Sequence, residues 1–170
     1  IVRRRAGNSA AAVEAFEKAI AMGIDSAEIH NSLGLALQDA GWRAKARHAF
    51  EQALEKNSSY TEASVNAGRL AASEGKFETA EKVLRRALDV KPRSSLLHNT
   101  LAAVLHEAGD SKSASQHFGV SLEVEPYNLV AAVRFAETLR ELGRSREALE
   151  FLVEHEVRFR AAPEFAEILA

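Results

Sequence analysis

Apolar and small residues recur along the chain at the spacing of amphipathic helices. Within residues 27–40 they lie three or four positions apart and would share one helical face: Ile29, Leu33, Ala36, Leu37 and Ala40. Gly41 follows, and glycine ends a helix readily because the left-handed conformation at a helix C-terminus costs it little. Residues 43–56 predict a second helix, which ends at the turn-forming residues 57–59. The stretch therefore predicts a helix hairpin.

This hairpin pattern repeats every 34 residues without an insertion. The turn glycine recurs as Gly7, Gly41, Gly75, Gly109 and Gly143, and an alanine five residues later as Ala12, Ala46, Ala80, Ala114 and Ala148. A small residue in each first helix faces that alanine, so the two helix axes can approach closely. One hairpin cannot bury both of its apolar faces, and the repeats are therefore expected to stack on one another.

The residues at these positions resemble the tetratricopeptide repeat (TPR) family. The family pattern has small residues at repeat positions 8, 20 and 27, glycine near 15, a bulky residue at 24 and often proline at 32. Position 8 reads Gly34, Gly68, Ala102 and Ala136, and position 32 reads Pro92 and Pro126 in two copies. The resemblance implies an all-α fold, a right-handed α-solenoid of stacked antiparallel helix hairpins.

We expect a single TPR array over residues 1–170. Its predicted parts are a partial repeat 1 (1–26), repeat 2 (27–60), repeat 3 (61–94), repeat 4 (95–128), repeat 5 (129–162) and a capping helix or the start of a sixth repeat (163–170). In the partial repeat, Gly7 is expected to end one helix and residues 10–22 to form the next. Because the chain begins with Ile1 in the middle of a repeat, we expect it to be a fragment of a larger protein.

The fifth repeat departs from the family pattern near its end. His155 stands where alanine is expected at position 27, and it is flanked by Glu154 and Glu156. These polar residues predict either an altered packing surface or a second helix that ends early.

Composition narrows the possible functions. The formal net charge is −2, so the chain has no basic excess with which to neutralise phosphates, and nucleic acid is not an expected partner. The chain has no cysteine, which excludes disulfides and thiolate metal sites. With no apolar run of membrane-spanning length and no signal peptide before the first repeat, we expect a cytoplasmic protein without membrane insertion.

No residue pattern predicts catalysis. The six histidines form neither an H-x-x-x-H pair nor an H-E-x-x-H motif, and they are interpreted as ordinary polar or interface residues. Gly109, Asp110, Ser111 and Lys112 lack the rest of a phosphate-binding loop, and no G-x-S-x-G motif occurs. We therefore expect a protein that is not an enzyme and has no metal and no cofactor.

The TPR resemblance implies that the first helix of each repeat lines a concave groove. Nine residues at the groove positions are the candidate partner-binding residues: Asn31, Gln38, Asn66, Arg69, Asn99, His106, Arg134, Glu137 and Arg140. Amides can bond to the backbone of an extended peptide, and a guanidinium group can hold a carboxylate. The expected function is a protein-interaction scaffold or adaptor that binds an extended peptide or partner segment, although the polar outer face of amphipathic helices would contain similar residues.

Two other functions stay open. The chain could be the substrate-presenting region of a larger enzyme such as a TPR-bearing glycosyltransferase, but the asparagine ladder at position 6 that would favour this is limited to Asn66. It could also be a structural module that self-associates through its ends. Chaperone-binding TPR proteins clamp a C-terminal carboxylate with two lysines, and those lysines are absent here, so this kind of partner is disfavoured.

Overall fold

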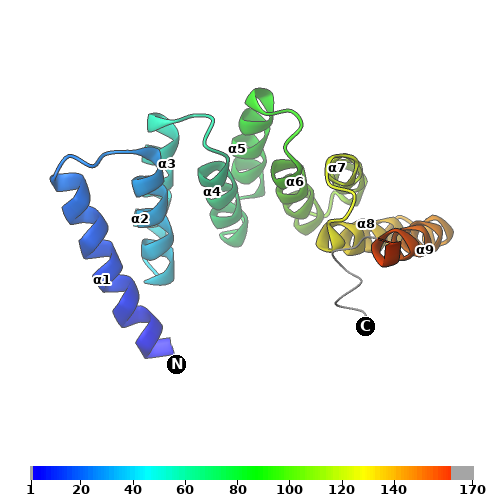
Figure 1. Cartoon of the computed structure of the whole chain (residues 1–170), viewed down its shortest axis with the longest axis horizontal. Helices are drawn as coiled ribbons and strands as arrows, with labels where there is room; N and C mark the ends of the chain where they lie inside the picture. The colour runs from blue at the N-terminus through cyan, green and yellow to red at the C-terminus, as the bar shows by residue number, and fades with distance from the viewer. Residues whose placement is uncertain (1, 162–170) are drawn as a thin grey trace. The chain divides into compact units, whose positions relative to one another are not determined.

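The computed structural model describes residues 2–161, with side chains from residue 9 to residue 155. The described residues form helices and no strand (Figure 1). In chain order the helices are α1 (Val2–Ala21), α2 (Ala27–Asp39), α3 (Arg43–Lys56), α4 (Thr61–Ser73), α5 (Phe77–Val90), α6 (Ser95–Glu107), α7 (Ser111–Val124), α8 (Leu129–Glu141) and α9 (Ser145–Ala161). The predicted all-α fold of helix hairpins is confirmed, and the segment predicted as a capping helix or sixth repeat lies outside the described residues.

The hairpin boundaries follow from local signals in the sequence. Helix α3 begins and ends at the predicted residues, and α2 ends one residue before the predicted position. Gly41 has a φ of +84°, the left-handed conformation expected after a helix. Ser26 precedes α2, and its hydroxyl accepts a hydrogen bond from the backbone N–H of Ile29, which satisfies one of the free donors at the helix start. None of the helices in the described part of the chain combines the length and apolar character needed to cross a membrane.

The predicted helix boundaries within the partial first repeat are wrong. Helix α1 continues through Gly7 instead of ending there, so one long helix replaces the predicted helix end and shorter second helix. A glycine inside a helix costs about 1 kcal/mol relative to alanine, but it removes no backbone hydrogen bond and can be tolerated. The glycine spacing alone therefore does not distinguish a turn from a continuous helix.

Of the two predictions for the fifth repeat, the altered packing at His155 is confirmed. The predicted early end of the second helix is wrong. Helix α9 continues past His155, which is buried. The Nε2 atom of His155 donates to the carbonyl oxygen of Pro126 at 2.7 Å, and its ring lies 4.3 Å from that of Phe151. A hydrogen bond from the buried imidazole to a backbone carbonyl thus lets a histidine occupy a position that usually holds alanine.

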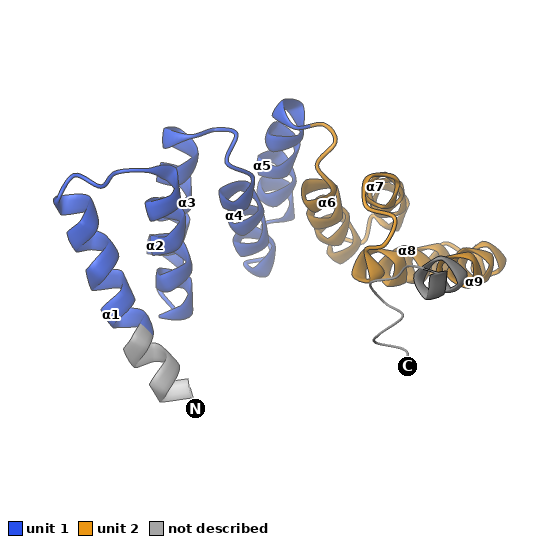
Figure 2. Ribbon diagram, in the orientation of Figure 1, with its two compact units in different colours: residues 1–91 blue, residues 92–170 orange. Residues whose placement is uncertain are grey.

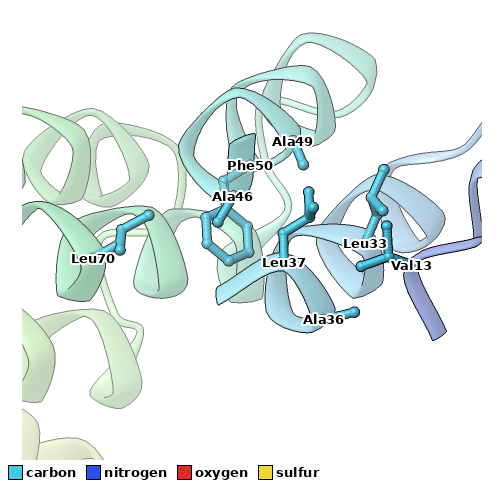
Figure 3. Packing of buried hydrophobic residues seen from close by; sticks show 8 residues of the cluster. All are labelled: Val13, Leu33, Ala36, Leu37, Ala46, Ala49, Phe50 and Leu70. Atoms are coloured by element: carbon cyan, nitrogen blue, oxygen red, sulfur yellow. The ribbon is translucent and has the colours of Figure 1, made fainter. Parts of the chain in front are cut away.

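The chain divides into two compact units, Ile1–Lys91 and Pro92–Ala170 (Figure 2). In the first unit, Phe50 of α3 belongs to a buried cluster with Leu37 of α2 and Leu70 of α4 (Figure 3). One aromatic side chain therefore joins a hairpin to the first helix of the next repeat. The described residues in this cluster are Val13, Leu33, Ala36, Leu37, Ala46, Ala49, Phe50 and Leu70.

The second unit has a core built by the same principle. Ala131 and Ala132 of α8 pack with Leu122 of α7, and Phe135 packs against this cluster. Phe135 also contacts Phe151 of α9 edge to face, with 4.8 Å between ring centroids. Helix α8 therefore covers the preceding hairpin with one face and packs on its own partner α9 with another.

Candidate functional site

In the first unit, the side chains of two neighbouring first helices are joined by an asparagine pair. The Nδ2 atom of Asn66 on α4 donates to the Oδ1 atom of Asn31 on α2 at 2.9 Å. Asn31 is only 6% exposed, whereas Asn66 is half-buried. A buried amide needs a partner, so this bond satisfies Asn31 and fixes the orientation of Asn66. We call the surface formed by Asn31, Leu35, Gln38, Asn66 and Arg69 the α2–α4 face.

Tyr60 lies at one end of this asparagine pair. Burial raises the pKa of its hydroxyl, and the negative charges of Glu62 and Glu28 raise the pKa further, while a hydrogen bond with Asn31 acts in the opposite direction. Tyr60 therefore stays neutral near pH 7 and keeps a polar group in contact with Asn31. This contact was not predicted, because nothing in the sequence spacing places residue 60 beside residue 31.

The remaining members of the α2–α4 face are available to a partner. Gln38 and Arg69 are exposed, and so is Leu35. The face thus combines an oriented amide, a guanidinium group and an apolar side chain. It offers hydrogen bonds to a peptide backbone, an ion pair to a carboxylate and a contact for an apolar side chain.

In the second unit, a carboxylate joins three helices. Oε2 of Glu141 on α8 accepts hydrogen bonds from Nε2 of His106 on α6 and from Oγ of Ser111 on α7, both at 2.9 Å. In a catalytic serine site the histidine contacts the serine. Here both groups contact the acid, so the carboxylate links the three helices.

These contacts lower the pKa of Glu141, chiefly through the hydrogen bond from Ser111. Burial has the next largest effect and raises the pKa. The hydrogen bond from His106, the charge of His106 and the charge of Arg140 lower it further. A lowered carboxyl pKa contributes stability above the ordinary value of 4.5, and that contribution is lost as the pH falls through the folded-state value.

We expect an NMR titration of the Glu141 carboxyl group to give a pKa below 4.5. Ser111→Ala should raise this pKa towards the ordinary value, because it removes the largest stabilising contact of the carboxylate. Ser113→Ala is the matched control, since the Ser113 side chain interacts with Asp110 instead. A pKa of Glu141 that does not respond to Ser111→Ala would contradict the observed contact.

The structure places the nine predicted partner-binding residues on first helices of the repeats, in two separate groups. Asn31, Gln38, Asn66 and Arg69 lie in the first unit, and Asn99, His106, Arg134, Glu137 and Arg140 lie in the second. Asn31 and Asn66 contact each other directly, whereas Gln38, Arg69, Arg134, Glu137 and Arg140 are exposed. Their role in binding stays a prediction.

The buried histidines have structural partners. Nε2 of His30 contacts the Asp25 carboxylate at 2.7 Å, and Nδ1 of His98 contacts Nδ1 of His117 at 2.9 Å. The other ring nitrogen of His98 donates to the carbonyl oxygen of Pro92 at 3.0 Å. No group of three or more histidine, aspartate or glutamate side chains in the described residues is arranged to hold a metal ion.

Comparison with known proteins identifies the repeat. A family model described as "Tetratricopeptide repeat" matches residues 1–41, 31–95 and 65–118. No curated protein sequence matches the chain.

Solved structures resemble the fold of most of the chain. A crystal structure of MamA is 18% identical with a TM-score of 0.78, over 94% of this chain and 95% of that chain. MamA from Desulfovibrio magneticus RS-1 is 15% identical with a TM-score of 0.77, over 96% and 93% of the two chains. Human IFIT1, whose structure is a dimer with m7Gppp-AAAA, is 26% identical with a TM-score of 0.70, but the match covers 82% of this chain and only 35% of IFIT1. The MamA likeness is one of fold alone.

Proposed function

Because the chain belongs to the tetratricopeptide repeat family, whose arrays serve as protein-interaction scaffolds, we propose that it is a non-enzymatic adaptor that binds an extended peptide on its α2–α4 face. The observation that carries this proposal is the hydrogen bond between buried Asn31 and half-buried Asn66, on the same face as the exposed side chain of Arg69. A hydrogen-bonded amide one helical turn from an exposed guanidinium group is a suitable arrangement for a peptide that carries a carboxylate.

The asparagine pair supports this proposal through its geometry. One N–H group of Asn66 is bonded to Asn31, which orients the amide before any partner arrives. The second N–H group and the carbonyl oxygen of Asn66 can then pair with one peptide unit of an extended chain. An amide that is already oriented loses less conformational entropy on binding than a free surface side chain.

Arg69 supports a partner with negative charge. It lies one helical turn after Asn66 on α4 and forms no ion pair within the described residues. A guanidinium group binds a carboxylate through two parallel hydrogen bonds, so an acidic side chain or a C-terminal carboxylate fits this position.

A polypeptide partner is favoured over RNA. The IFIT1 structure contains a capped RNA, but the match covers only about a third of that protein. The net charge of −2 gives this chain no general attraction for a phosphate backbone. We therefore propose a peptide ligand for the α2–α4 face.

The test is a display screen of random and C-terminal peptides, followed by affinity measurements on variants. We expect the selected peptides to contain an acidic group and to bind Arg69→Ala about tenfold or more weakly, as the loss of one charged hydrogen-bonded contact predicts. Arg85→Ala is the matched control, because Arg85 is a surface arginine on α5 that pairs with Glu81 and lies outside the face. Peptides that bind both variants equally well would remove the α2–α4 face as the binding site.

A further inference from the structure

The second unit contains an apolar groove between its last two described helices. The groove has a volume of ≈ 290 Å³, and its walls include Val133, Glu137 and Arg140 of α8 and Leu149 and Leu152 of α9. Leu149 is 64% exposed and Leu152 is 40% exposed, and Val133 is also exposed. Large apolar side chains gathered on one surface are typical of an interaction site.

In the preceding hairpin of the same unit, the residues at the equivalent positions are buried. Phe118 stands 34 residues before Leu152 and is only 1% exposed, and Ser115 stands 34 residues before Leu149 and is buried. Helix α8 packs on that hairpin through Ala131 and other residues. The position of Leu152 is thus one that the fold buries in the other repeats, where Phe50, Leu84 and Phe118 are at most 1% exposed. Covering Leu149 and Leu152 would remove apolar surface from water.

The charges along the groove are self-complementary. Glu137 and Arg140 are opposite in sign, lie one turn apart on α8 and line the same groove. Neither forms an ion pair within the described residues, although the charge of Arg140 contributes to the lowered pKa of Glu141. A two-fold interface joins the same patch of both molecules. If the axis lies level with the midpoint between Glu137 and Arg140, the two copies of α8 face each other in antiparallel fashion, and Glu137 of each copy lies opposite Arg140 of the other.

We infer that two copies of this chain associate through the surface formed by Val133, Glu137, Arg140, Leu149 and Leu152, which we call the α8–α9 face. The apolar side chains of the two copies bury one another, and the two Glu137–Arg140 pairs set the antiparallel arrangement. This inference goes beyond the proposed peptide binding, which rests on Arg69 in the other unit and is measured separately.

The first experiment is sedimentation equilibrium over a range of protein concentrations. We expect a reversible dimer, and we expect Leu149→Glu to weaken its association by about tenfold or more because it places two carboxylates in the apolar centre of the interface. Leu96→Glu is the matched control, since Leu96 is an exposed leucine on α6 that does not line the groove. Since both leucines are exposed, circular dichroism should show unchanged helix content in both variants.

Charge reversal tests the two-fold arrangement directly. Glu137→Arg and Arg140→Glu should each weaken the dimer, because each places like charges opposite one another, whereas the double variant should restore it. A wild-type chain that is monomeric at all concentrations would overturn the inference and leave the face to a different partner. A dimer that is insensitive to Leu149→Glu, or single charge variants that the double variant does not rescue, would overturn it as well.

Discussion

Phe50→Ala is expected to lower the free energy of unfolding by about 3–5 kcal/mol, the typical cost of removing a large aromatic side chain from a packed core. Phe50 is 0% exposed and belongs to the cluster that joins α2, α3 and α4. Its removal leaves a cavity between two repeats, and stacking between repeats supplies much of the stability of such arrays. Chemical denaturation followed by circular dichroism measures the change.

Phe50→Leu is the matched control for this prediction. Leucine occupies the equivalent position in the next repeat, where Leu84 is also completely buried. A smaller apolar side chain of similar shape should cost less than about 1.5 kcal/mol if the surrounding residues repack. Equal losses for the alanine and leucine variants would show that the aromatic ring itself, and not the filled volume, supports the stack.

Gly34→Ala is expected to destabilise the chain by about 1–3 kcal/mol, as overpacking of a core does, although alanine favours helix formation. An added Cβ at Gly34 would lie 2.6 Å from Cδ1 of Phe50 and closer still to Cε1. The ring is fully buried in a packed cluster, so moving it away from the new methyl group would displace its neighbours. Thermal unfolding of the two proteins under the same conditions measures the difference.

Gly119→Ala is the control that separates packing from helix propensity. Gly119 also lies inside a helix, α7, but the nearest atom to its added Cβ is a ring carbon of Phe135 at 4.0 Å, an ordinary contact. This variant should therefore be stabilised by about 0.5–1 kcal/mol. If Gly34→Ala is stabilised to the same extent, the close approach of α2 and α3 at Gly34 is not present in solution.

These two glycines show how far sequence reasoning extends. The 34-residue spacing predicted that Gly34 is a point of close helix approach, and the structure confirms it. The sequence pairs Gly34 with Ala46, however, whereas the atoms that come closest belong to Phe50, one turn further along α3. The repeat pattern specifies which helices meet, but the side-chain directions within the packed hairpin decide which atoms touch.

The candidate binding residues could be predicted only in part. Family positions correctly placed Asn66 and Arg69 on a first helix, but they could not show that Asn31 is buried and bonded to Asn66. Ser111 was not among the predicted site residues, although it contacts Glu141 from the start of the next helix. Both contacts join residues about 30 or more positions apart, so they depend on how successive helices pack and leave no local mark in the sequence.

The sequence by itself determined the hairpins, their turns and their register, because helix periodicity, the glycine after each first helix and the N-terminal caps act over a few neighbouring residues. Only the tertiary structure decided that α1 continues through Gly7, that His155 is bonded to Pro126, and that Leu152 stays exposed while its equivalents Phe50, Leu84 and Phe118 are buried. These outcomes depend on what packs against a residue from elsewhere in the chain. A sequence specifies local hydrogen bonding directly, whereas burial is a property of the assembled neighbours.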